Sequence, residues 1–148
     1  KSLDVEENME LNFKSIAQKY ADVENRDDLS EEKKDFLRRF ESFWSKPSGE
    51  RVLELFKPDA QVHFAGQGTV SGEEYAGLMD AILAGVETIQ VDVVDYAERG
   101  DRLFIFWHAT RLSNGKHLSW HGVDRFRIEK GMAVEEQVIF DTQVLSGD

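Results

Sequence analysis

The sequence predicts an α+β domain in which helices pack on one face of an antiparallel sheet. Apolar residues follow a helical spacing through much of the first half of the chain, up to about residue 83. Four long β-rich runs then follow one another, separated by short turns that contain Gly. Helices first and consecutive hairpins after are typical of α+β domains rather than of alternating α/β folds. The 148 residues are enough for one such domain with a real core.

The first 29 residues are predicted to form an accessory acidic segment. Large apolar residues recur there at spacings of four, three and four, namely Met9, Phe13, Ile16 and Tyr20. This stripe predicts one amphipathic helix, and residues 25–29 interrupt it. We therefore divide the chain into residues 1–29, an accessory helix and a break, and residues 30–148, the α+β domain. The narrow stripe favours docking of the helix on the domain or on a second chain.

Three more helices are predicted before the long strands. Ser30 is suited to be an N-cap, because two carboxylates follow it in the first turn. The apolar face of this helix contains Phe36, Leu37, Phe40, Phe43 and Trp44. A short helix is expected over residues 52–56, ended by Pro58. After a short strand at residues 61–64, a further helix is expected from Glu73 to about Leu83.

The second half predicts a series of β-hairpins. The β-rich runs are Thr88–Glu98, Arg102–Leu112, His117–Glu129 and Val134–Val144. The breaks between them contain Gly100, Gly115 and Gly131. Glycine at such sites supplies the positive φ that tight hairpin turns need. The expected product is a sheet whose strands are neighbours in sequence and in space.

Composition excludes several classes of function. The net charge of −11 disfavours binding to nucleic acid and to anionic membrane surfaces. The chain has no Cys, so disulfides, thiolate nucleophiles and Cys-based metal sites are excluded. No apolar run approaches the roughly 18 residues that span a bilayer. The first ten residues lack the apolar block of a signal peptide, which predicts a cytoplasmic protein. The sequence leaves open whether a leader was removed before Lys1.

Asp124 is the first candidate for chemistry. Strand alternation places it on one face with Trp120, Gly122 and Phe126. A carboxyl group in an apolar row is costly to ionise, so we expect its pKa to lie above about 3.9. The functional interpretation is a general acid or hydrogen-bond donor. The structural alternative is an Asp bonded to a buried backbone amide or to an arginine.

Other candidates are weaker. Asp141 ends the last apolar run and is either an acid–base partner of Asp124 or a turn residue at the end of a strand. Three of the four histidines lie in predicted strands, but their spacing gives no metal-binding motif. We therefore expect neither a metal nor a cofactor.

From about Phe36 to Leu145 the chain resembles the SnoaL-like branch of the nuclear transport factor 2-like superfamily. The resemblance rests on the order and spacing of several short segments. These are Leu55–Ala60, Ser71–Glu74, Gly100–Arg102, Gly122–Ile128, and Gly131 followed ten residues later by Asp141. It implies a curved antiparallel sheet that N-terminal helices wrap into a cone with an internal apolar pocket. The helix before residue 25 is an addition to this pattern.

Three enzyme types within the superfamily fit the sequence poorly. Asp124 lies nine residues after Gly115, as does the oxyanion-binding Asp of ketosteroid isomerases, but Phe64 and Phe40 occupy the positions of the base and the phenol. A true ketosteroid isomerase is therefore not expected. Gly122 replaces the Arg of the epoxide-hydrolase relay. The histidines suited to a scytalone dehydratase type of site, His108 and His121, are predicted to face away from Asp124.

The SnoaL cyclases, which use an acid–base Asp without metal or cofactor, give the best match. The resemblance implies Asp124 and Asp141 as the catalytic pair. It also implies a pocket lined by Phe40, Phe64, Met79, Ile105, Trp107, Trp120 and Gly122. We expect a cofactor-independent cyclase, isomerase or hydratase for a small apolar or aromatic, oxygenated ligand. The alternative is a non-catalytic ligand-binding or dimerisation module of the same fold.

A homodimer is the expected assembly. The face of the sheet opposite to Asp124 carries aromatic, apolar and arginine side chains together. Members of the superfamily often pair their sheets back to back. A twofold contact of this kind is self-complementary, and the acidic chain can supply partners for the arginines.

Overall fold

The structure is a computed structural model that describes residues 28–66 and 68–145. The described helices are α2 (Glu31–Ser45), α3 (Gly49–Val52), α4 (Gly72–Ala84) and the 3-10 helix η1 (Thr142–Leu145). The strands are β1 (Phe56–Phe64), β2 (Gly68–Ser71), β3 (Thr88–Arg99), β4 (Arg102–Ser113), β5 (Lys116–Glu129) and β6 (Met132–Phe140). The predicted N-terminal helix lies outside the described residues.

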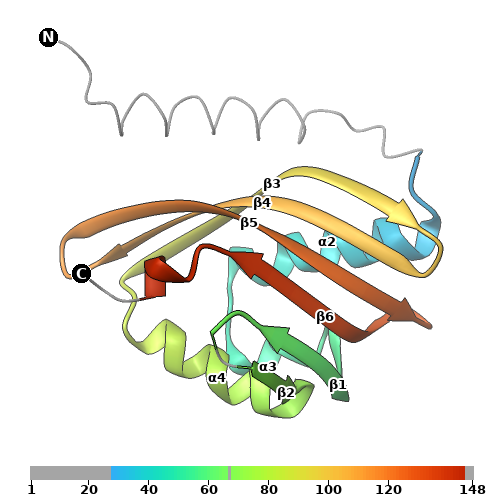
Figure 1. Cartoon of the computed structure of the whole chain (residues 1–148), viewed down its shortest axis with the longest axis horizontal. Helices are drawn as coiled ribbons and strands as arrows, with labels where there is room; N and C mark the ends of the chain where they lie inside the picture. Colours follow the sequence, from blue (N-terminus) through green and yellow to red (C-terminus); the bar gives the residue numbers. More distant parts are fainter. Residues whose placement is uncertain (1–27, 67, 146–148) are drawn as a thin grey trace, which may run out of the picture.

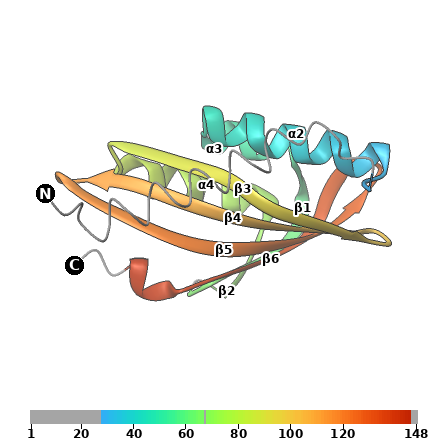
Figure 2. The ribbon, with the colours of Figure 1, turned by 90° about the horizontal axis from the view of Figure 1, so that it is seen from above.

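The strands form one curved, open sheet in the order β2-β1-β6-β5-β4-β3. Helices α2, α3 and α4 lie together on one side of this sheet (Figures 1 and 2). All neighbouring strands are antiparallel except β1 and β6, which pair in parallel. The predicted α+β class with helices on one face of a curved sheet is confirmed. Within the described residues, no helix is both long and apolar enough to cross a membrane.

The long hairpins follow from the turn residues that the sequence places between the strands. Gly100, Gly115 and Gly131 adopt φ of 60°, 74° and 80°. Strands β4 and β5 pair without interruption from Arg102↔Arg127 to Ser113↔Lys116. This continuous register fixes which side chains share the inner face of the sheet.

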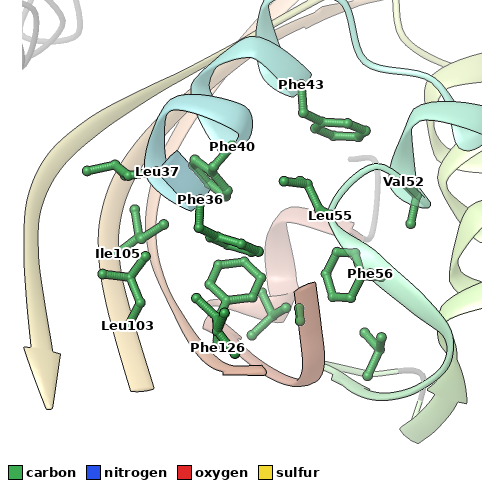
Figure 3. Close-up of a cluster of buried hydrophobic side chains, with 14 of the residues drawn as sticks. Phe36, Leu37, Phe40, Phe43, Val52, Leu55, Phe56, Leu103, Ile105 and Phe126 are labelled. Carbon is green, nitrogen blue, oxygen red and sulfur yellow. The ribbon is translucent and has the colours of Figure 1, made fainter. Parts of the chain in front are cut away.

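Helix α2 covers one end of the sheet and contributes several large aromatic residues to the core. The Ser30 hydroxyl accepts a hydrogen bond from the Lys33 N–H, so the predicted N-cap is confirmed. Phe36, Phe40 and Phe43 are buried on its inner face. Figure 3 shows the Phe36 ring directed toward Phe126 on β5. Phe36 and Phe126 are 4.8 Å apart between ring centroids. This aromatic contact holds the helix on the sheet.

Two local expectations for the first strands are wrong. The third helix covers residues 49–52 instead of 52–56, and β1 already begins at Phe56 and includes Pro58. Pro58 lies where the pairing of β1 with β6 is irregular, between Phe56 and Gln61. An imino acid is tolerated there because the ladder does not need its N–H. The short strand β2, which pairs with the end of β1, was not expected as a strand.

Candidate functional site

The inner row of β4 and β5 positions the candidate residues. Trp107 pairs with Gly122, and Ile105 pairs with Asp124. On the other side of β5, Asp124 pairs with Val138 of β6. A side chain on Gly122 would meet the Trp107 indole, since a Cβ there would lie 2.2 Å from Cζ2. Gly122 therefore gives the Trp107 ring its place beside Asp124.

A cavity opens over this row, between α4 and the sheet. It offers about 90 Å³ to the centres of water-sized molecules, and about 750 Å³ of space between atoms when its open mouth is counted. Its wall is mainly aromatic and aliphatic. The described lining residues are Trp44, Phe64, Tyr75, Met79, Ile82, Leu83, Val86, Ile89, Val91, Trp107, Ala109, Arg111, Trp120, Asp124, Val138, Phe140 and Val144. An apolar concavity with a few polar groups is the usual form of a small-molecule site.

Asp124 is the acidic group of this cavity. Its side chain is buried, with 6% of the residue exposed. Burial raises its pKa to about 8, and the nearby Trp107 indole N–H opposes part of this rise. The Trp107 Nε1 itself lacks a hydrogen bond of good geometry to any described residue. Asp124 is therefore a neutral carboxylic acid at pH 7, able to donate a hydrogen bond or a proton into an apolar space.

Glu136 places a second carboxyl group beside the first. It is 2% exposed, and its Oε1 has no hydrogen-bond partner among the described residues. Burial raises its pKa well above the usual range, and the charge of Asp124 raises it further. Both residues line a smaller cavity of about 20 Å³ behind the first one. Two such carboxyl groups cannot both ionise without a large electrostatic cost, so the pair retains at least one proton at neutral pH.

Tyr75 lies near the two carboxyl groups, on the helical side of the cavities. It lies on α4, is buried, and lines both the larger and the smaller cavity. Burial raises the pKa of its phenol, and the charges of Glu136 and Asp124 act in the same direction. Two buried carboxyl groups that share at least one proton and a neutral phenol thus lie close together around the smaller cavity.

The predicted pocket residues lie in three different environments. Phe64, Met79, Trp107 and Trp120 line the larger cavity together with Asp124. Phe40 lines the smaller cavity only. Ile105 is fully buried in the packed core, and Gly122 lies under the Trp107 ring.

The predicted pairing of Asp124 with Asp141 is not formed. Asp141 follows the last residue of β6 and is exposed. Its Oδ1 accepts a hydrogen bond of 3.0 Å from the Gln143 N–H, at the start of η1. It therefore has the turn role that the sequence left open as the alternative. The carboxyl group that does meet Asp124 is that of Glu136.

His108 and His121, the histidines of the dehydratase comparison, lie on the outer face of the sheet. His108 and His121 are cross-strand partners with ring centroids 5.1 Å apart. Neither belongs to the cavity wall, in agreement with their predicted orientation. Across the described residues, no group of three or more His, Asp or Glu side chains is arranged to hold a metal ion.

Sequence reasoning missed Glu136 and Tyr75, although each had a detectable signal. Glu136 precedes Val138 and Phe140 by two and four residues, so strand alternation places it on their inner row. Tyr75 precedes Met79 by four residues, which places both on one face of α4. The alternation pattern of Glu136 is obscured by the neighbouring Glu135, because a pair of glutamates usually indicates a solvated strand.

The fold and the cavity define a small α+β pocket protein of the type built on one strongly curved sheet. The SnoaL-like domain family matches residues 37–136, about two thirds of the chain. The chain belongs to this family, as the resemblance implied. A comparison with curated proteins finds no match.

Solved structures agree on the fold. An NTF2-like protein of unknown function from Burkholderia pseudomallei superposes with a TM-score of 0.69 at 20% identity, covering 79% of this chain and 95% of that one. IdmH, a candidate polyketide cyclase from Streptomyces antibioticus, gives 0.68 at 18% identity, covering 77% and 95%. A candidate SnoaL-like polyketide cyclase from Jannaschia gives 0.66 at 17% identity, covering 80% and 94%.

Proposed function

We propose that this chain binds a small, apolar, oxygenated molecule in the larger cavity and that Asp124 donates a hydrogen bond or a proton to its oxygen. The observation that carries the proposal is a buried carboxylic acid, kept neutral by its surroundings, at the wall of an apolar cavity. A neutral acid in a site with little water is a strong donor to a carbonyl or enolate oxygen. The SnoaL-like family membership supports a cyclase, isomerase or hydratase.

The chemistry needs no group outside the chain. In an aldol-type ring closure, an enol carbon attacks a carbonyl carbon and the carbonyl π electrons move to oxygen. That oxygen takes the Asp124 proton, while the enol hydroxyl becomes a ketone and its proton returns to the carboxylate. Asp124 is thereby regenerated. Glu136 and Tyr75 hold further protons beside it and stabilise the uncharged state.

The test compares a ketone with its parent hydrocarbon. We expect the bicyclic ketone tetralone to bind the full chain at least about 10-fold tighter than tetralin, measured by Trp fluorescence at pH 6, since a hydrogen bond from an acid contributes on the order of 1–2 kcal/mol. Asp124→Leu should abolish the preference, because it removes the donor. Asp124→Asn should retain part of it, because the amide still donates. Equal binding of ketone and hydrocarbon by the wild type would overturn the proposal.

The runner-up, a non-catalytic binding module, predicts the same binding without turnover. It is separated from the enzyme by Asp124→Asn, which keeps a donor but cannot transfer a proton. If an aromatic β-diketone is cyclised by the wild type and not by this variant, the catalytic form is supported. Binding of the diketone without product by both chains favours the module.

We further propose that two chains associate through the outer face of the sheet. Ile139 on β6 is 61% exposed, and Phe106 on β4 is 37% exposed. Two of the outer arginines already have partners within the chain, since Arg125 contacts Glu135 at 2.7 Å and Arg127 contacts Glu129 at 2.9 Å. The apolar residues would therefore carry the contact. Light scattering should give about twice 17.0 kDa. Ile139→Lys should lower this mass, whereas Leu53→Lys, an equally polar change at another exposed apolar residue, should not.

A further inference from the structure

We propose that Arg111 makes the cavity selective for an anionic ligand, an apolar ring system with a carboxylate at its outer end. This inference rests on the proposed function, because it names the class of molecule that would occupy the same cavity. Among the described residues that line the cavity, Arg111 alone carries a positive charge. The inner wall is otherwise apolar apart from Asp124 and Tyr75, whose protic groups are neutral at pH 7.

The guanidinium of Arg111 is held in place but is not neutralised. It lies 5.9 Å from the centre of the Trp120 ring, a cation–π contact that orients its plane. One N–H of Nη2 donates to the Val144 carbonyl at 3.0 Å. A guanidinium has five N–H donors, so most of them are available to a ligand. No described carboxylate lies within salt-bridge distance of it.

Arg111 lacks a described carboxylate partner although the chain is rich in carboxylates. The chain has 29 Asp and Glu residues for 18 Lys and Arg. Two arginines on the outer face of the sheet do have carboxylate partners: Arg125 contacts Glu135 at 2.7 Å, and Arg127 contacts Glu129 at 2.9 Å. A partly buried cation whose partners among the described residues are a carbonyl and an indole retains its attraction for an anion. A planar, oriented fork matches a carboxylate in two parallel hydrogen bonds.

The positions of the two polar ends set the length of the ligand. Asp124 is paired with Ile105, and Arg111 lies six residues further along β4 on the same inner row. Six residues span about 20 Å along a strand. Arg111 and Asp124 both line the cavity that covers this interval. A ligand that meets both must carry its anionic group and its carbonyl or hydroxyl oxygen at opposite ends of a flat, apolar body.

The test uses a hydroxynaphthoic acid with its hydroxyl and carboxyl groups at opposite ends, and the methyl ester of the same compound. We expect the full chain to bind the acid at least about 10-fold tighter than the ester at pH 7, as measured by quenching of Trp fluorescence. Arg111→Met removes the charge and keeps the apolar stem over Trp120. This variant should bind the ester within about twofold of the wild type and should lose the preference for the acid.

Two matched variants make the result specific. Arg111→Lys should keep part of the preference, because it retains the charge without the fork. Asp124→Leu should weaken the acid and the ester by the same factor and leave their ratio unchanged. Equal binding of acid and ester by the wild type, or an unchanged preference in Arg111→Met, would overturn the inference while leaving the proposed pocket intact. Failure of the wild type to bind either compound would overturn the pocket itself and the inference with it.

Discussion

The two ends of the inner face differ in packing although they lie on the same strands. At one end, Leu103 and Phe126 are packed against α2, with 0% and 1% of their surfaces exposed. At the other end, Trp107 and Trp120 of the same two strands face the cavity. Both ends are rich in aromatic residues, so composition does not explain the difference.

The length of α2 explains it better. Helix α2 delivers a Phe on successive turns but ends at Ser45. Beyond that point the sheet is faced by α4, whose residues Met79 and Leu83 line the cavity wall. Asp124 lies at the boundary, since it lines both the larger cavity and the smaller one among the α2 rings. The packed end thus fixes the position of the acid, and the open end gives it access to a ligand.

The largest difference between the two ends is expected in the stability lost when one phenylalanine is truncated at each end. Phe36→Ala should lower the free energy of unfolding by about 3–5 kcal/mol, because Phe36 is fully buried and its neighbours cannot close the gap. Phe64→Ala should cost about half as much or less, since Phe64 is half-buried and already borders the cavity. Urea denaturation measures both. Equal losses would show that the open end is as tightly packed as the other.

The buried acid should make the wild type less stable as pH rises. The pKa of Asp124 is higher in the folded chain than in the unfolded one, so the folded state holds more protons between about pH 4 and 8. The free energy of unfolding therefore falls over this interval, by on the order of a few kcal/mol. Asp124→Asn should reduce this slope and be more stable than the wild type at pH 8.

Glu136 supplies the control for this titration. Its folded pKa is also raised, so part of the slope should persist in Asp124→Asn and disappear in the double variant with Glu136→Gln. Chemical denaturation from pH 4 to 8 measures the three chains. A wild type that grows more stable with pH, relative to the double variant, would mean that Asp124 is ionised in the folded protein.

A smaller effect is expected at the glycine beneath the Trp107 ring. Gly122→Ala places a methyl group against the indole and should destabilise the fold by about 1–3 kcal/mol. Gly77→Ala is the control: its added Cβ meets no atom within 4 Å, and alanine is preferred in a helix by about 1 kcal/mol. Thermal unfolding and the Trp emission maximum measure both. Stability equal to the wild type in Gly122→Ala would show that the Trp107 ring moves freely.

The sequence predicted the scaffold better than the polar centre, for a physical reason. Asp124 was found because alternation within one strand is a local pattern, and the same pattern placed His121 on the opposite face. The family resemblance pairs Asp141 with Asp124, whereas the orientation of Asp141 depends on where β6 ends and η1 begins, a boundary that periodicity does not fix. Glu136 meets Asp124 only through the pairing of β5 with β6, whose register shifts near Arg127. Such a shift cannot be read from either strand alone.

The smallest effect on stability, and the sharpest on function, is expected from the Tyr75 hydroxyl. It makes no hydrogen bond to any described residue, and it lies at the boundary of the two cavities with Asp124 and Glu136. Tyr75→Phe should therefore change the free energy of unfolding by no more than about 0.5 kcal/mol. If the hydroxyl donates to the same ligand oxygen as Asp124, the variant should bind tetralone several-fold more weakly and tetralin unchanged. Fluorescence titration of the two probes gives both numbers. A variant that loses stability but keeps its preference for the ketone would place the hydroxyl in the packed end, as part of the core, and would move the boundary of the site towards the Trp107 side.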